Sequence, residues 1–178
     1  MSYGWHGEKV RLVPLDKARH MENALQWMND PDITAWTLMG DFPLSRLAEE
    51  EFFDSRMRAS ETEIGFSVET LEGEEHIGFA GIHKIDFRHG FAQTGTIIGR
   101  KDLWGHGYGR DAARIRTAYA FDVLGLRLLL SEVMTENIAS IKMLEAAGYR
   151  EMGRIPRRYW KRGAYRDVVL MVAERFAA

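Results

Sequence analysis

The sequence predicts a mixed α/β fold, in which a mostly antiparallel twisted sheet contains one parallel β-α-β crossover and carries helices on both faces. Residues 64–100 hold three strand-like segments joined by turns, which is typical of an antiparallel meander. Residues 91–135 pass from strand to helix and back to strand, which is typical of a parallel crossover. The chain has 178 residues, without internal repeats or a linker, so we expect a single domain over residues 1–178.

The first third of the chain predicts one strand and two helices. Lys9–Leu15 alternates charged and apolar side chains, as a strand does. Lys17–Met28 places apolar side chains at helical spacing, and the polar turn Asp30-Pro31-Asp32 ends that helix. Ser45 is a favourable N-cap for a second helix, which extends to about Ala59.

The rest of the chain predicts three strands, a helix, a strand, a helix and two strands. Gly125 and Gly148 end the two helices, and Asn137 caps the start of the second one. Three consecutive leucines, Leu128–Leu130, indicate a strand that is covered on both faces. The expected elements, in chain order, are Ile64–Leu71, His76–Phe87, Phe91–Arg100, Asp111–Val123, Arg127–Thr135, a helix after Asn137, Tyr149–Tyr159 and Asp167–Ala173.

Composition excludes several classes of protein. The chain has no cysteine, so a disulfide framework, a thiolate metal site and a cysteine nucleophile are excluded. A net charge of -2 argues against nucleic acid as a partner. No apolar run approaches the roughly 20 residues of a membrane helix, so we expect no membrane partner and a cytoplasmic location. Without a paired-histidine spacing, we predict no metal.

A glycine-rich segment, Leu103–Arg110, lies between the third meander strand and the following helix. Gly105, Gly107 and Gly109 remove the Cβ atoms that would block a ligand, and backbone N–H groups at a helix start favour an anion. The segment therefore predicts a cradle for a diphosphate, to which Arg110 adds a positive charge. A tight glycine turn without a ligand is the alternative.

The same segment limits which diphosphate fits. A dinucleotide loop needs a third glycine where Arg110 stands, together with further β-α units. A P-loop needs Gly-Lys followed by Ser or Thr, which the chain lacks. Coenzyme A is the common ligand that remains, and a dinucleotide-binding module is the weakest alternative.

The motifs of the C-terminal half resemble those of the GNAT superfamily of N-acetyltransferases. Gly107 and Gly109 match the last fixed positions of its pyrophosphate loop, with Trp104 in place of a Gln or Arg. Asn137-x-x-Ser140 followed by Met143–Tyr149 resembles the branch that contains ribosomal-protein-alanine N-acetyltransferases. Gly163–Asp167 resembles the C-terminal signature of that branch, and the likeness extends from about Val10 to Ala173.

The resemblance implies the GNAT acyl-CoA N-acyltransferase fold and acetyl-CoA as co-substrate. The strand that ends at Gly99 would splay from the strand at Arg127, and the pantetheine arm would enter the gap, held by Asn137, with its thioester near Ser140. The residues expected to bind the co-substrate are Ile97, Ile98, Gly99, Trp104, Gly105, His106, Gly107, Tyr108, Gly109, Arg110, Asn137, Ser140 and Met143.

Two positions depart from the pattern of the family. Leu144 stands where many members have a tyrosine that protonates the leaving thiolate, and Ser140 is the substitute that the resemblance suggests. Gln93 stands where the branch often has a glutamate base. Since an amine must lose its proton before it attacks, another group has to serve, and the nearby candidates are His83, Asp86 and His89. Solvated edge positions are the alternative for these three residues.

We therefore predict an N-acetyltransferase that moves an acetyl group to a primary amine by direct attack in a ternary complex. The acceptor is a small amine or a peptide N-terminus, for example a polyamine, an aminoglycoside or an amino acid. A non-catalytic acyl-CoA sensor or scaffold is the alternative, and a homodimer is compatible with the sequence. Acidic and aromatic side chains would attract the ammonium group, and those expected are Trp27, Asp30, Asp32, Trp36, Met39 and Asp41.

Overall fold

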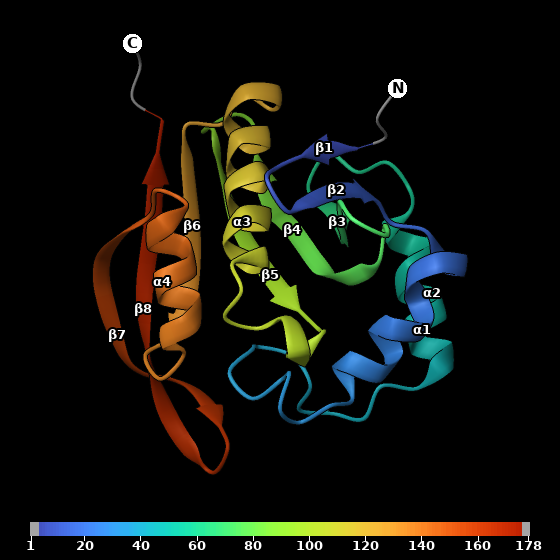
Figure 1. Ribbon diagram of the computed structural model, residues 1–178. Helices are drawn as coiled ribbons and strands as arrows, with labels where there is room; N and C mark the ends of the chain where they lie inside the picture. Colours follow the sequence, from blue (N-terminus) through green and yellow to red (C-terminus); the bar gives the residue numbers. More distant parts are fainter. Residues whose placement is uncertain (1–3, 176–178) are drawn as a thin grey trace.

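The computed structural model describes residues 4–175 and contains one eight-stranded sheet with the order β1-β2-β3-β4-β5-β6-β8-β7 (Figure 1). Only β5 and β6 run parallel, and the other neighbouring pairs are antiparallel. The predicted mixed sheet with one parallel crossover is thereby confirmed. The strands are β1 (Trp5–His6), β2 (Val10–Pro14), β3 (Ile64–Thr70), β4 (His76–Asp86), β5 (Phe91–Ile98), β6 (Leu128–Met134), β7 (Arg150–Lys161) and β8 (Ala164–Glu174).

Four α-helices cover the sheet on both faces: α1 (Lys17–Met28), α2 (Arg46–Arg56), α3 (Tyr108–Ala118) and α4 (Ile138–Ala146). Phe79 of β4 packs edge-on against Trp27 of α1 and Phe53 of α2. Thr96 of β5 bonds instead to Arg116 of α3. Because Phe79 pairs with Ile97, Thr96 points to the opposite face. The helices α1 and α2 thus cover one face, and α3 and α4 cover the other.

Helix starts follow local capping. The side chains of Asp16, Ser45 and Asn137 accept hydrogen bonds from backbone N–H groups three residues later, at 3.1, 3.2 and 3.2 Å. Such caps satisfy N–H groups that the helix itself leaves free. The predictions for Ser45 and Asn137 are confirmed, and the predicted range of α1 has the observed bounds.

The glycine-rich segment is organised differently from the prediction. A 3₁₀ helix, Lys101–Leu103, precedes it, and α3 begins at Tyr108 rather than at Asp111. Gly107 is the N-cap, with a φ of 88° in the left-handed region that favours glycine. Gly109 therefore lies in the first turn of the helix rather than in the loop. A π-helical turn, Tyr119–Val123, continues α3.

The parallel strands β5 and β6 part after three residue pairs, as expected. Ladder pairing joins 91–93 to 128–130 and goes no further. The last link between the two strands is the Ser131 hydroxyl, which donates to the carbonyl of Thr94 at 3.0 Å. Beyond it, Gly95–Ile98 and Glu132–Met134 form the two sides of an opening in the sheet.

An ion cluster around the buried Glu69, formed with Arg11, Arg19 and His20, joins β2, α1 and β3. The fully buried Glu69 carboxylate forms ion pairs with the guanidinium groups of Arg11 at 2.7 Å and Arg19 at 2.6 Å, and it lies 3.0 Å from the ring of His20. The other ring nitrogen of His20 accepts from the backbone of Asp16 at 2.9 Å. Every charge in the cluster is paired.

None of the helices within residues 4–175 is both long and apolar enough to cross a membrane.

Candidate active site

The start of α3 forms a cradle of backbone N–H groups. Gly105 and Gly107 have positive φ values of 78° and 88°, and no side chain caps the first turn. Uncapped N–H groups and the helix dipole favour an anion at this place. A Cβ built on Gly107 would lie 3.5 Å from the Arg110 guanidinium and 3.7 Å from the Lys9 side chain. Two cations thus flank the cradle, and Arg110 has no ion-pair partner within residues 4–175.

The cradle fits the diphosphate of coenzyme A. Gly109 allows α3 to approach its neighbours, because a Cβ there would lie 3.2 Å from the sulfur of Met143 and 3.4 Å from Ile98. The indole of Trp104 donates to the carbonyl of Ile98 at 2.8 Å, and so fixes the loop to β5. His106 bonds to the carbonyl of Trp104 at 2.8 Å. When bound, the co-substrate supplies the activated acetyl group.

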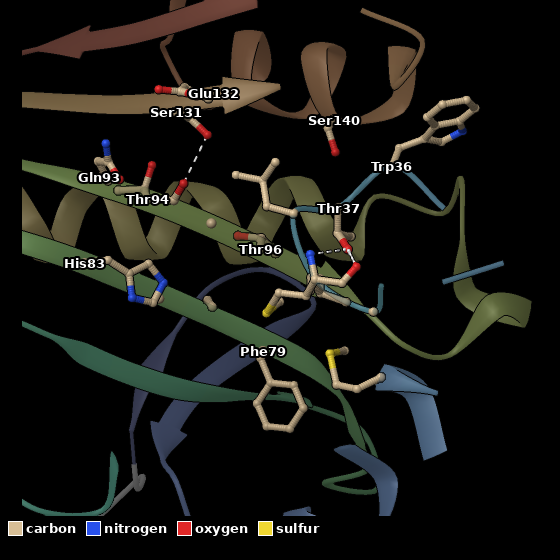
Figure 2. Close-up of a pocket in the computed structure, with 18 of the residues that line it drawn as sticks. Trp36, Thr37, Phe79, His83, Gln93, Thr94, Thr96, Ser131, Glu132 and Ser140 are labelled. Atoms are coloured by element: carbon tan, nitrogen blue, oxygen red, sulfur yellow. Dashed lines mark hydrogen bonds between the residues drawn. The ribbon is translucent and has the colours of Figure 1, made fainter. Parts of the chain in front are cut away.

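A cavity of about 800 Å³ passes through the opening between β5 and β6 and extends under α1 and α2. Figure 2 shows His83 and Gln93 toward one end of it, and Ser140 and Trp36 toward the other. Among the residues predicted for the site, those that line the cavity are Trp36, Met39, His83, Gln93, Ile97, Asn137, Ser140 and Met143. Ile98, Gly99 and 104–110 lie outside it, next to the opening or in the cradle.

His83 is the predicted base that reaches the cavity. Its ring lies over Gly81, where a Cβ would come within 2.4 Å of Nε2. Burial, and then the positive charges of Arg56 and Arg116, hold the pKa of His83 below its ordinary value of 6.5. The ring is therefore neutral at pH 7 and can accept a proton. Asp86 and His89, the other candidates, bond to each other at 2.9 Å and do not line the cavity.

Gln93 is the cross-strand neighbour of His83, on the same face of the sheet. Its amide is not a base, but it lies where it can order water beside the histidine ring. Gly95, two residues further along β5, leaves this face open, since nothing lies within 4 Å of a Cβ built there. An acceptor amine can therefore approach the opening from the side of α1 and α2.

Ser140 lies in the first turn of α4. Its backbone N–H donates to the side chain of Asn137, and its hydroxyl has no hydrogen-bond partner among the described residues. Leu144 is buried one turn further on, so no acid occupies the position of the missing tyrosine. The oxygen of the Asn137 side chain accepts the capping hydrogen bond of α4, which leaves its amide N–H group able to donate to a ligand.

Four residues predicted to bind the acceptor do not line the cavity. Trp27 packs against Gly99, where a Cβ would lie 1.9 Å from the indole. Lys101 pairs with Asp30 at 2.8 Å and with Asp32 at 3.1 Å. Lys161 pairs with Asp41 at 2.6 Å. These carboxylates hold loop 29–45 to its neighbouring segments. An acidic side chain in the cavity therefore has to belong to another part of the chain.

The cavity contains two carboxylates that the sequence analysis missed. Glu132 of β6 accepts a hydrogen bond from Tyr159 at 2.5 Å and lies 3.6 Å from the guanidinium of Arg158. Glu49 of α2 is 4% exposed and lines the cavity, without any partner for its carboxylate within residues 4–175. Burial raises the pKa of Glu49.

No group of three or more His, Asp or Glu side chains that could hold a metal occurs in the described part of the chain.

A glycine cradle at a helix start, beside two parallel strands that part around a cavity, defines an acyl-CoA-dependent transferase. Comparison with known families agrees, since residues 9–150 match the acetyltransferase (GNAT) domain. The chain belongs to the GNAT acetyltransferase family and is an acetyl-CoA-dependent N-acetyltransferase.

The relatives are diverse. An uncharacterized N-acetyltransferase, p20 of Bacillus licheniformis, is 30% identical over 131 residues, which is 72% of each chain. The FsC-acetyl coenzyme A-N(2)-transacetylase of Aspergillus fumigatus is 28% identical over 80% of this chain and 63% of its own length. A spermidine N-acetyltransferase of Vibrio cholerae, solved with CoA and spermine, superposes with a TM-score of 0.84 at 22% identity, over 93% of this chain and 95% of that chain. The last likeness concerns the fold.

Proposed function

We propose that the acceptor is a small diamine or polyamine, whose reacting amine meets the thioester at the opening while its second ammonium group lies against Glu49. The observation that carries the proposal is the unpaired, buried carboxylate in the wall of the cavity. A cation stabilises an ionised carboxylate in such a place, and no residue among 4–175 pairs with Glu49. Spermidine acetylation by a protein of the same fold supports the same class of acceptor.

The rest of the cavity suits an acceptor with an apolar body. Phe52, Phe66 and Phe79 line it together with aliphatic side chains. Two of its other charged groups are paired, Arg56 with Glu63 and Arg158 with Glu132, and Lys84 lines it without an ion pair among the described residues. One ammonium at Glu49 and one uncharged amine at the thioester therefore satisfy the cavity, with a short alkyl chain between them.

Catalysis would proceed by direct attack. The amine nitrogen forms a bond to the carbonyl carbon, the carbon–sulfur bond breaks, and the proton of the amine passes to His83 through water ordered by Gln93. The hydroxyl of Ser140 donates to the departing sulfur. We assign these roles to His83, Gln93 and Ser140 because they line one cavity and because His83 and Ser140 have no competing side-chain partner among the described residues.

Acceptor kinetics test the substrate class. Release of CoA should be followed with α,ω-diamines, spermidine, n-alkyl monoamines of matched length and short peptides. A diamine should have a kcat/KM at least about tenfold above that of its monoamine, which corresponds to about 1.4 kcal/mol. Glu49→Gln should remove this preference by raising the KM for the diamine, and should leave the monoamine unchanged.

The control is Glu51→Gln, which changes an exposed carboxylate on the same helix. The likeness to the ribosomal-protein-alanine branch makes a peptide N-terminus the competing acceptor. A peptide that outperforms every diamine, with no effect of Glu49→Gln, would contradict the proposal. The expected cytoplasmic location and a homodimer remain predictions.

A further inference from the structure

Arg116, in the middle of α3, is a fully buried cation without a counter-ion. Its exposed fraction is 0%, and it is the largest of the completely buried side chains. No carboxylate lies within ion-pair distance among residues 4–175, and its Nε has no hydrogen-bond partner there. Arg11, the other buried arginine, pairs with both Glu69 and Glu74 at 2.7 Å.

The guanidinium lies behind the wall of the cavity and is joined to it by hydrogen bonds. One Nη donates to the hydroxyl of Thr96 at 2.5 Å, and the other donates to the hydroxyl of Tyr149 at 3.4 Å. The Tyr149 hydroxyl bonds in turn to Thr94 at 2.9 Å. Thr94 and Thr96 both line the cavity, Thr94 at the last link between β5 and β6 and Thr96 on the side of the opening (Figure 2).

Stability does not explain this arrangement. A buried charge without an ionic partner is destabilising, and an apolar side chain of similar volume in its place is often neutral or stabilising. Two neutral hydroxyls compensate the charge only in part. The position therefore has a cost in folding, and its benefit has to come from the adjacent site.

We propose that Arg116 is a positioning residue for acetyl transfer: through Thr96 and Tyr149 it fixes β5 at the opening, and it holds a positive charge behind the place where the thioester reacts. The inference depends on acetyl transfer at this site and not on which amine is the acceptor.

A positive charge at this place would favour the chemistry. As the bond between nitrogen and carbon forms, electrons move to the carbonyl oxygen, and when the carbon–sulfur bond breaks they leave with the sulfur. A fixed positive charge in a dry site stabilises both distributions more than it stabilises the neutral thioester. The same charge acts on His83 from the other face of the sheet, in addition to the charges of Arg56 and Lys84. It thus also helps to keep the base free of its proton.

The test compares Arg116→Lys, which keeps the charge, with Arg116→Gln, which removes it and keeps N–H donors. Steady-state kinetics should show kcat lower by about ten- to hundredfold in Arg116→Gln and by less than about tenfold in Arg116→Lys. The KM for acetyl-CoA should change little. Arg114→Gln is the matched control, because Arg114 is exposed on the same helix and pairs with Glu8.

Two measurements without turnover complete the test. Calorimetric titration with CoA should give similar affinities for wild type, Arg116→Lys and Arg116→Gln. The pKa of His83, followed by NMR of the ring, should rise in Arg116→Gln and stay low in Arg116→Lys, because only the first variant loses a neighbouring positive charge. A purely structural role would leave that difference at zero.

Equal kcat values in the two arginine variants, or an unchanged pKa of His83 in Arg116→Gln, would overturn the proposal. If Arg116→Gln does not fold, Thr96→Val provides the second test. It removes the hydroxyl that holds the guanidinium, and kcat should fall about three- to tenfold at unchanged KM for acetyl-CoA. An unchanged kcat there would also overturn the proposal.

Discussion

Glu69 and Glu49 are both buried carboxylates, 0% and 4% exposed, yet their surroundings differ completely. Glu69 is held by Arg11, Arg19 and His20, between β2, α1 and β3. Glu49 lies in the wall of the cavity with no partner in the described chain. A charge that the fold pairs with its own residues serves the fold. A charge that it leaves unpaired beside a cavity is available to a ligand.

His76 and His83 differ in the same way, since one has hydrogen-bond partners within the fold and the other does not. The ring of His76 bonds to Asn23 at 3.1 Å and to the carbonyl of Gly78 at 3.0 Å, and burial lowers its pKa to about 3. His83 also has a pKa lowered by burial, but its ring has no hydrogen-bond partner among residues 4–175. Both rings are neutral at pH 7, and only the ring of His83 is free to accept a proton in the cavity.

The largest expected effect is on stability, at the paired carboxylate. Glu69→Gln should lower the free energy of unfolding by about 3 kcal/mol, because Arg11, Arg19 and His20 all lose their buried ionic partner and Arg11 keeps only Glu74. Urea denaturation measures this loss. The ratio of kcat/KM values for diamine and monoamine should stay as in wild type in the protein that remains folded.

The control for that variant is Glu22→Gln, which breaks an exposed pair with Arg46. Exposed pairs contribute about 0–1 kcal/mol, so the change should be small. If Glu69→Gln were no more destabilising than Glu22→Gln, then pairing at Glu69 would not stabilise the fold, and the contrast with Glu49 would have no basis.

An intermediate effect is expected on turnover, at the unpaired hydroxyl of Ser140. Ser140→Ala should lower kcat about ten- to hundredfold, which corresponds to about 1.4–2.7 kcal/mol. The KM for acetyl-CoA and the stability should change little, since the hydroxyl has no hydrogen-bond partner in the part of the chain that the structure describes. Ser140→Cys should fall between alanine and wild type. An unchanged kcat, with chemistry rate-limiting, would mean that water or Tyr108 protonates the sulfur.

Sequence patterns predicted the parts that depend on near neighbours. The bounds of α1, the caps at Ser45 and Asn137 and the loop around Gly107 follow from residues a few positions apart. The 3₁₀ helix before Trp104 and the two-residue strand β1 were missed, because segments this short have no periodicity to detect.

The site was predicted only in part, because the position of its residues depends on tertiary packing. Glu49, Glu50 and Glu51 are adjacent and chemically identical, and only the packing of α2 on the sheet places the first of them in the cavity. Arg114 and Arg116 differ in the same way, since one is exposed and the other is buried. What distinguishes the proposed functional residue in each case is burial without an ionic partner among the described residues, which local sequence does not encode.

The smallest expected effect is on the pH dependence of stability at Glu49, and it tests directly whether Glu49 differs from Glu69. Its pKa is raised in the folded protein, so the native state holds the proton more tightly than the unfolded state. Relative to a neutral side chain, Glu49 therefore costs nothing below its ordinary pKa of 4.5 and destabilises the protein as pH rises through the folded pKa. Glu49→Gln should be as stable as wild type at about pH 3, below the ordinary pKa, and slightly more stable at pH 7.5, by on the order of 0.5 kcal/mol. Urea denaturation at the two pH values measures this difference, and a saturating diamine should stabilise wild type more than the variant at pH 7.5. A loss of stability in Glu49→Gln at pH 7.5 comparable to that of Glu69→Gln would mean that the protein itself pairs Glu49, and the carboxylate would then belong to the fold and not to the acceptor.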